Sequence, residues 1–490
     1  MMKYWGKIAR FLIGAHLCSA APASEEVKAL PGWQGPLPSR WWSGFLEVGG
    51  SKKKIHYTLV EKIGEEAKEA PLVMWTNGGP GCSGYDGLLY EHGPLLISHD
   101  GSELVFNKYT WANHANMLYF EAPAGVGFSY SGDNADYTTG DNQTASDNLA
   151  ALVSFFAKFP EYKKNDFYLS GESYGGIYVP TLAQKIFREP SFPGNMKGFL
   201  CGNCVFDSCG STRIPFVYGH GGISQDTYDA AIRACGPAFN GTSAACRAIN
   251  DEVDAMVQDL NVYDFYRDCY HSDAQRAKVL GSTFDPWRVA EQHDYHHLRN
   301  LPPLPRPPHP VVAHSKAVRS QSLVGEVPPC IDTDGATKWL NRKDVQKALH
   351  VEESTVASWS VCSDILRYRH DEVYHGMKPL YRELMGKYRI AVYNGDTDPA
   401  CNYLGDEWCM KQLGAPVKRK WHPWYYSDPQ QVGGWAVEYD AGGDGGDGDL
   451  HFYTIKGAGH MAPQWRPAAT ASMFATFLGG DTASKHSVLV

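Results

Sequence analysis

Residues 167–180, FYLSGESYGGIYVP, decide the fold of this chain. The apolar run 167–170 has the composition of a β-strand, and the stretch from Ile177 carries apolar residues at helical spacing. Between them lies the pattern G-x-S-x-G, whose small residues let a chain turn sharply from strand to helix and leave the serine exposed above the sheet. The context therefore makes Ser173 a candidate nucleophile.

Strands and helices alternate on both sides of this turn. The strand candidates are residues 45–48, 55–60, 72–75, 117–120, 167–170, 198–201, 389–394, 435–439 and 450–455. The helix candidates are residues 144–159, 177–187, 225–235, 242–260, 337–350 and 467–477. This alternation is the pattern of a sheet layered with helices. Together with the G-x-S-x-G turn at 171–175, it predicts an α/β-hydrolase fold, with a central, mostly parallel mixed sheet flanked by helices.

The distribution of apolar runs, expected helices and strands, and prolines divides the chain into four parts. Residues 1–23 read as a signal peptide, because basic residues precede an apolar run that is too short to span a bilayer. Residues 24–206 form the first half of the core, 207–335 an insertion or cap of short helices and loops, and 336–490 the second half. Within the insertion, the proline-rich stretch 301–310 is expected to be an exposed, extended loop.

Composition excludes several classes of function. The chain has 490 residues, of which 43% are hydrophobic, and its net charge of −9 gives no general electrostatic reason to bind nucleic acid. Outside the N-terminus no segment is apolar enough to cross a membrane. The twelve cysteines are scattered rather than paired as zinc knuckles, which favours disulfides in an oxidising compartment. The stretch DAGGDGGDGD at 440–449 fits no calcium-binding pattern and predicts a flexible hairpin loop.

A nucleophilic serine needs a base, and the base needs a third group to orient it. In α/β-hydrolases these partners follow in the order serine, acid, histidine. The loops NGDTD at 394–398 and GAGHM at 457–461 each follow a strand candidate in this order. His460 is flanked by small residues after its strand, whereas spacing alone does not choose between Asp396 and Asp398.

A second glycine-rich turn, WTNGGPGCSG at 75–84, also follows an apolar strand. Its backbone N–H groups are free of side-chain obstruction and could stabilise an oxyanion. The rival interpretation is a phosphate-binding loop, but no Lys-Ser/Thr pair follows the glycines and there is no G-x-G-x-x-G. An oxyanion hole is therefore favoured.

With these motifs in order, the chain resembles the serine carboxypeptidases, which include lysosomal cathepsin A, the yeast vacuolar enzyme and the plant seed enzymes. The matching segments are TNGGPGCSG (76–84), LLYEHGP (88–94), GESYGGIYVP (171–180), ATKWLNRKDVQKALHV (336–351), GDTDPACN (395–402) and GAGHMAP (457–463). The resemblance implies that Ser173, Asp398 and His460 form the catalytic triad. It also implies that the N–H groups of Gly79 and Tyr174 form the oxyanion hole.

The same resemblance assigns a group that binds the C-terminal carboxylate of the substrate. It consists of Asn77, the Gly78 N–H, Glu91 and Glu172, with Trp75 beside it. Two carboxyl groups that face a substrate carboxylate cannot all ionise, so at least one must hold a proton. The implied activity is hydrolysis of the last peptide bond of peptides and proteins with a free C-terminus, favoured at acid pH, through an acyl-enzyme and with no metal or organic cofactor.

Three alternatives share parts of this pattern. Acyltransferases on the same fold tend to alter the residues corresponding to Asn77 and Glu172, and both are intact here. A non-catalytic binding partner would be expected to lose a triad member, and a general esterase has no reason to keep the carboxylate-binding group. The compartment could be a lysosome, a vacuole or the exterior, and the chain could be a monomer or a homodimer.

The resemblance also sorts the cysteines. It pairs Cys82 with Cys362, Cys235 with Cys246 and Cys269 with Cys330, and it implies a free thiol at Cys401 near the active site. Four cysteines stay unassigned, namely Cys201, Cys204, Cys209 and Cys409, and Cys204 replaces the glycine that the family usually has. Asn142 and Asn240 begin Asn-x-Ser/Thr triplets, which makes them candidate glycosylation sites.

Overall fold

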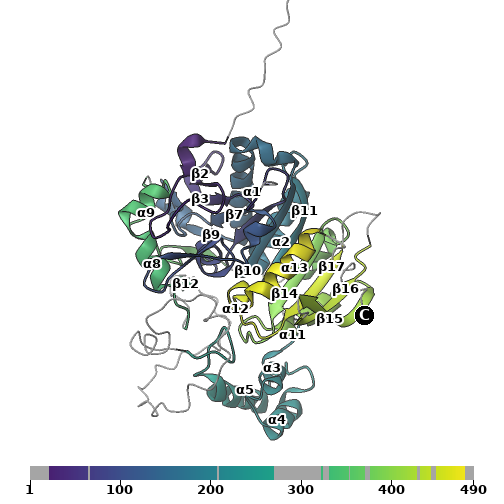
Figure 1. Ribbon diagram of the computed structural model, residues 1–490. Coiled ribbons are helices and arrows are strands. Elements are labelled where there is room, and N and C mark those ends of the chain that lie inside the picture. Colours follow the sequence, from purple (N-terminus) through teal and green to yellow (C-terminus); the bar gives the residue numbers. More distant parts are fainter. Residues whose placement is uncertain are drawn as a thin grey trace, which may run out of the picture.

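The structure is a computed structural model that describes residues 21–64, 67–206, 209–269, 322–323, 330–352, 354–369, 376–426, 431–442 and 449–479 (Figure 1). Residues 1–20 of the expected signal peptide, the proline-rich stretch 301–310 and residues 443–448 of the expected hairpin loop lie outside these ranges. In the described part, no helix has an apolar stretch long enough to cross a bilayer.

A twelve-stranded sheet forms the centre of the described chain, in the order β1-β2-β3-β7-β4-β10-β11-β14-β17-β16-β15, with β8 paired to β3. The strands are β1 Glu26–Val27, β2 Trp41–Glu47, β3 Lys53–Val60, β4 Leu72–Thr76, β7 Asn116–Glu121, β8 Tyr130–Ser131, β10 Asp166–Ser173, β11 Asn195–Cys204, β14 Arg389–Gly395, β15 Val417–Tyr426, β16 Gln431–Tyr439 and β17 Leu450–Ile455. Neighbouring strands are parallel from β7 to β17 and antiparallel towards both edges. The chain therefore has the α/β-hydrolase fold that the sequence predicts.

The remaining elements connect these strands. The helices are α1 Asp141–Lys158, α2 Gly175–Phe187, α3 Arg213–Gly219, α4 Gln225–Cys235, α5 Ala244–Val257, α8 Asp334–Leu340, α9 Lys343–Ala348, α10 Met377–Leu384, α11 Tyr403–Gln412, α12 Ala462–Trp465 and α13 Pro467–Gly479. Short helical turns are η1 Ala23–Glu25, η2 Gly87–Glu91, η3 Trp111–Asn113, η4 Asn134–Tyr137 and η5 Pro160–Lys164. Two small sheets contain β5 Leu95–Ile97 with β6 Leu104–Phe106, and β9 Thr138–Gly140 with β13 Arg367–Arg369 and β12 Ser322–Leu323.

Helices cover both faces of the central sheet, and each face has its own apolar core. Along β4, Leu72 and Met74 point into the core beneath α1, α2 and α10, while Val73 and Trp75 point into the core beneath α8, α9 and α13. This alternation is the two-residue period of a strand that is buried on both sides. On α1, apolar residues recur at helical spacing, so that Phe155 and its neighbours face the sheet.

Helices α3, α4 and α5 form a separate group below the sheet in Figure 1. They have a small apolar core of their own, built from Ile214, Phe216, Val217, Ile223, Ala231, Phe239 and Val253. The segment that follows α5 returns to the sheet, where the Phe265 N–H donates to the Thr397 carbonyl at 2.8 Å. This contact brings residues of the expected insertion next to the C-terminal loops.

Some predicted elements differ from those observed. The single helix expected at 337–350 is two helices, because the Asn341 side chain caps α8 by donating to the Thr337 carbonyl at 2.8 Å. Its Oδ1 also accepts the Trp359 N–H, which fixes the corner. Strand β15 was not expected, since its sequence VKRKWHPWYY is mostly exposed and contains Pro423, which suits only an edge strand. Helices α3, α10 and α11 were not expected either.

Four disulfides occur among the described residues: Cys82–Cys362, Cys209–Cys409, Cys235–Cys246 and Cys269–Cys330. Three of them are the pairs that the family resemblance implies, and Cys209–Cys409 joins two of the unassigned cysteines. The described cysteines outside disulfides are Cys201, Cys204 and Cys401. Asn142 and Asn240 are both exposed, so each triplet is accessible.

One carboxyl group of the core makes stability depend on pH. Asp406 on α11 is buried, and Asn394 Nδ2 of β14 donates to its Oδ2 at 2.8 Å. Burial, together with the nearby Asp398 charge, raises the pKa of Asp406 to about 8. In the unfolded chain the same group ionises near its ordinary value, so the folded state holds an extra proton between these two values.

We therefore expect the free energy of unfolding to fall as pH rises from 5 to 7, by about 1.4 kcal/mol per pH unit for this group. Asp406→Asn keeps a neutral side chain of the same shape and should reduce that pH dependence by about 3 kcal/mol between the two pH values. Urea unfolding at pH 5 and pH 7 measures both quantities. The exposed Asp226→Asn serves as the control and should leave the dependence unchanged. An equally steep dependence in Asp406→Asn would contradict the assignment.

Candidate active site

Ser173 ends strand β10 and begins the turn into α2 with a φ of 58°. This left-handed conformation is unfavourable for a serine, so the surrounding structure must impose it. The flanking residues show how: a Cβ on Gly171 would lie 2.6 Å from the Thr76 carbonyl oxygen, and one on Gly176 would lie 2.1 Å from that of Val205. Only glycine fits at these positions, and the serine is left partly exposed at the end of the sheet.

His460 and Asp398, which the resemblance assigns to a triad with Ser173, meet in the structure. His460 Nδ1 lies 2.7 Å from Asp398 Oδ2, and both residues are buried, with 4% and 0% of their surface exposed. Their loops follow β17 and β14, which are neighbours in the sheet and close to β10. The backbone N–H of His460 donates to the Tyr263 carbonyl at 2.7 Å, and the two rings lie 4.8 Å apart.

The structure also shows what each aspartate of the GDTD loop does. Asp398 accepts the Asn203 amide at 2.9 Å and the backbone N–H groups of Ala400 and Cys401 at 2.8 and 3.2 Å. Asp396 instead accepts the Gly457 N–H at 2.6 Å, and burial raises its pKa to about 6. The histidine therefore faces Asp398, while Asp396 holds the loop that carries the histidine.

The glycine-rich turn after β4 lies directly against the elbow. A Cβ on Gly78 would be 2.3 Å from the Tyr174 backbone nitrogen and 2.8 Å from the Ser173 Cβ. Gly79 has a φ of 108°, which L-residues with side chains rarely adopt. The backbone segments of Gly79 and Tyr174 thus lie side by side next to Ser173, which is the placement that an oxyanion hole requires.

Asn77 is the centre of the expected carboxylate-binding group. Its Oδ1 accepts Trp75 Nε1 at 2.7 Å and the Gly87 N–H at 3.1 Å. Its Nδ2 donates to Glu91 Oε1 at 3.2 Å and to Glu172 Oε1 at 3.1 Å. Both glutamates are buried, and each has a second oxygen with no hydrogen-bond partner within the described structure. A ligand with a polar end would satisfy those two oxygens.

Burial makes these carboxyl groups hold their protons. It raises the pKa of Glu91, and it raises the pKa of Glu172 further because the Glu91 charge lies beside it. Asp86 completes the cluster, since oxygens of Asp86, Glu91 and Glu172 lie within 4.8 Å of one another. Burial raises the pKa of Asp86 to about 6, and the field of His460 opposes that rise. Three carboxyl oxygens could in principle hold a cation, but protonated groups that share an amide donor suit a carboxylate better.

Cys401 lies beside Asp398 and His460. Oxygen, nitrogen and sulfur atoms of Asp398, His460 and Cys401 lie within 4.8 Å of one another. Burial and the charge on Asp398 raise the pKa of the Cys401 thiol well above its ordinary value, so the group stays protonated. Another free thiol, Cys204, lies behind the elbow, and its sulfur is 3.9 Å from the Gly171 carbonyl oxygen.

Sequence reasoning missed three residues of this site. Tyr263 belongs to the expected insertion and has no motif around it, and Asp86 lies inside the SGYDG turn without a pattern of its own. Asn203 stands out only as a glycine-asparagine pair, although its Oδ1 accepts the Gly395 N–H at 2.9 Å and its amide holds Asp398. Only Asn203 carried any signal, because it fits the glycine-asparagine turn that the family has at this place.

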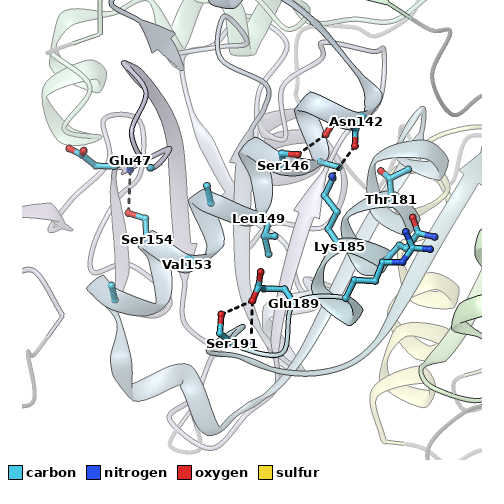
Figure 2. Close-up of a pocket in the computed structure, with 16 residues that line it drawn as sticks. Glu47, Asn142, Ser146, Leu149, Val153, Ser154, Thr181, Lys185, Glu189 and Ser191 are labelled. Carbon is cyan, nitrogen blue, oxygen red and sulfur yellow. Dashed lines mark hydrogen bonds between the residues drawn. The ribbon is translucent and has the colours of Figure 1, made fainter.

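A groove of about 770 Å³ lies elsewhere, between α1 and α2 (Figure 2). Its floor includes Leu149 and Val153, and Asn142 and Lys185 lie at one end, where the lysine donates to the asparagine at 2.8 Å. None of the triad or carboxyl-cluster residues lines this groove. The candidate active site is therefore defined by its chemistry and not by the size of a cavity.

Comparison with known proteins agrees with this geometry. The family model described as serine carboxypeptidase matches residues 31–480. The mouse lysosomal protective protein is 37% identical over 477 residues, covering 94% of this chain and 95% of the relative. Serine carboxypeptidase-like 21 of Arabidopsis thaliana is 36% identical over 494 residues, covering 95% and 96%.

Among solved structures, that of Kex1(delta)p, a prohormone-processing carboxypeptidase from Saccharomyces cerevisiae, superposes with a TM-score of 0.68. It covers 94% of this chain and 96% of the other at 19% identity, which supports the shared fold. With a family model that matches nearly its whole length, and with relatives of more than 30% identity over the same span, the chain belongs to the serine carboxypeptidase family.

Proposed function

We propose that this chain removes the C-terminal residue of peptides and proteins through a covalent acyl-enzyme on Ser173. The observation that carries the proposal is the buried carboxyl cluster that adjoins the nucleophile. Glu172 precedes Ser173 in the chain and shares the Asn77 amide with Glu91. A substrate carboxylate held at this cluster would place the last peptide bond, and no bond further along the peptide, at the serine.

The triad geometry supports an acyl-transfer mechanism. Asp398 accepts the Nδ1–H of His460, which leaves the other ring nitrogen to take the Ser173 proton as the hydroxyl attacks the peptide carbonyl. The N–H groups of Gly79 and Tyr174 are proposed to hold the oxyanion. The imidazolium then gives its proton to the leaving amine, and a water molecule, deprotonated by the same histidine, hydrolyses the ester.

The carboxyl cluster supports recognition of a free C-terminus. A protonated Glu91 or Glu172 can donate to the substrate carboxylate, together with the Asn77 side chain and the proposed Gly78 N–H. An amide at the same place would present N–H donors, which need acceptors instead, and neither an amide nor an ester carries the negative charge that these donors bind. Asn77 and Glu172 are both present and hydrogen-bonded to each other, which favours the hydrolase over an acyltransferase.

We further propose that the protein works in an acidic compartment of the secretory pathway or outside the cell. The buried carboxyls Glu91, Glu172 and Asp406 keep their protons most easily at low pH, and the four disulfides of the described chain suit an oxidising route. The lysosomal protective protein of the mouse is a relative whose name states such a location.

The first test is the nucleophile. Ser173→Ala removes the attacking oxygen, so kcat for an N-acylated dipeptide should fall by at least about 10⁴-fold, as it does when a triad member is lost. Thermal unfolding of the variant should match the wild type, because the side chain becomes smaller at a partly exposed site. Retention of peptidase activity by the variant would contradict the triad assignment.

The second test is the pH dependence of substrate recognition. For a dipeptide with a free carboxylate, kcat/KM should fall as pH rises through the titration of the Glu91 and Glu172 pair, because ionised glutamates repel the substrate. The amidated dipeptide and an ester should fall less. Glu172→Gln removes one titrating group and should flatten the profile of the free-carboxylate substrate. Identical profiles for free and amidated substrates would reject the anchor.

The third test uses the thiol beside the triad. A mercurial that binds Cys401 would add a bulky group next to Asp398 and His460 and should abolish activity. Iodoacetamide should react slowly, because the raised pKa leaves little thiolate. Cys401→Ser should resist the mercurial, and Cys204→Ser should remain sensitive. Inhibition that persists in Cys401→Ser would show that another thiol is responsible.

A further inference from the structure

A connected set of buried hydroxyls lies behind the elbow, on the side away from Asp398. The N–H of Gly81, in the glycine-rich turn, donates to the Tyr178 hydroxyl at 3.1 Å. The Tyr178 ring packs against the Tyr368 ring, with the ring centroids 6.1 Å apart. Tyr368 in turn donates to Asp141 Oδ1 at 2.9 Å, and Tyr174 donates to the same oxygen at 2.8 Å. Two hydrogen-bonded groups, joined by packed rings, thus connect one proposed oxyanion-binding segment with the other.

The hydrogen bonds at each end have a clear direction. The Tyr178 hydroxyl accepts the Gly81 N–H, and the Tyr174 and Tyr368 hydroxyls both donate to Asp141 Oδ1. Burial raises the pKa of both Tyr178 and Tyr368, so both keep their protons. The protons of Tyr174 and Tyr368 therefore both point towards one carboxylate.

Packing fixes the side chains that make these bonds. The rings of Tyr174 and Tyr178 meet edge to face at 5.3 Å, and the Tyr368 ring contacts them at 5.7 and 6.1 Å. Asp141 is also buried. Buried rings with satisfied hydroxyls have few alternative rotamers, so each bond holds its backbone segment in place.

Asp141 and Tyr368 come from two segments that a small sheet holds together. Strand β13 carries Tyr368 and pairs in parallel with β9, where Tyr368 is opposite Thr139. Asp141 is the first residue of α1 and follows β9 directly. This sheet lies outside the central sheet, and neither Asp141 nor Tyr368 touches the triad through any bond described above. The positions of Asp141 and Tyr368 therefore indicate a role other than direct catalysis.

We propose that Asp141, Tyr178 and Tyr368 are positioning residues that hold the two oxyanion-binding segments at their working separation. The inference rests on the proposed function, since it assumes that Gly79 and Tyr174 bind the oxyanion. Gly79 lies two residues before Gly81 in the turn that Tyr178 holds, and Asp141 holds Tyr174 itself. Loss of one hydroxyl lets the segments shift relative to each other, and a shift of about 1 Å is enough to weaken a transition-state contact by as much as 100-fold.

The test compares two tyrosine-to-phenylalanine variants. Tyr368→Phe should lower kcat for both a free-carboxylate dipeptide and an ester by about 10-fold to 100-fold, with KM nearly unchanged, because the loss is confined to the transition state. The matched control is Tyr162→Phe on η5, since the Tyr162 side chain is about as buried as that of Tyr368. This substitution removes a hydroxyl that donates to Glu61 Oε1 at 3.0 Å. It should reduce thermal stability without changing kcat.

A second measurement separates positioning from general loosening of the core. An N-acyl amino aldehyde adds to serine and forms a tetrahedral oxyanion, whereas an N-acyl amino acid binds only through its carboxylate. Tyr368→Phe should weaken the aldehyde by the same factor as kcat and leave the amino acid unaffected. Asp141→Asn, which keeps an acceptor oxygen for both hydroxyls, should retain more activity than Asp141→Ala.

An unchanged kcat in folded Tyr368→Phe, or equal weakening of both inhibitors, would overturn the proposal. If Tyr368→Phe does not fold, Tyr178→Phe removes the neighbouring hydroxyl of the same series and is expected to change kcat and both inhibitor affinities in the same way. Wild-type protein that hydrolyses the ester but not the dipeptide would reject the proposed carboxypeptidase function, and the positioning role would still be decided by the ester and the aldehyde.

Discussion

The active site depends on one close approach between two backbone turns. The turn after β4 and the elbow after β10 lie so near each other that no Cβ fits on Gly78, and the parallel pairing of β4 with β10 fixes their relative height. Neither turn could bind an oxyanion alone, because two N–H groups must converge from different directions. The same close approach therefore explains why both motifs contain glycines.

The same approach brings acidic groups into an enclosed space. Glu172 is part of the elbow, and Glu91 ends the helical turn η2 that follows the glycine-rich loop. Ionising a buried carboxyl group costs free energy. The two glutamates avoid much of this cost because they keep their protons and because both accept hydrogen bonds from the Asn77 amide. In the function proposed above, an uncharged pair of glutamates binds the charged end of the substrate. Binding of the substrate carboxylate would then be coupled to protonation of Glu91 and Glu172.

Local sequence predicted the elements whose conformation is set locally. The elbow was evident because glycines flank a serine between a strand and a helix, and His460 was evident because small residues flank it after a strand. The choice of Asp398 over Asp396 came from family resemblance, and its physical reason, the contact with His460, appears only in three dimensions. The partners Asn203 and Tyr263 approach the site from distant segments, so no spacing in the sequence could reveal them. Strand β15 was not predicted for a different reason: an exposed edge strand lacks the apolar pattern from which strands are predicted.

The disulfides also determine how the chain is connected. Ser173 lies before the segment 270–329, and Asp398 and His460 lie after it, so the triad is assembled from both sides. Cys82–Cys362, Cys209–Cys409 and Cys269–Cys330 each join a residue before that segment to a residue after it. A single cut of the peptide backbone between residues 270 and 329 would therefore leave two polypeptides that remain one covalent molecule. Under reducing conditions they would separate on a denaturing gel, while under oxidising conditions they would migrate together.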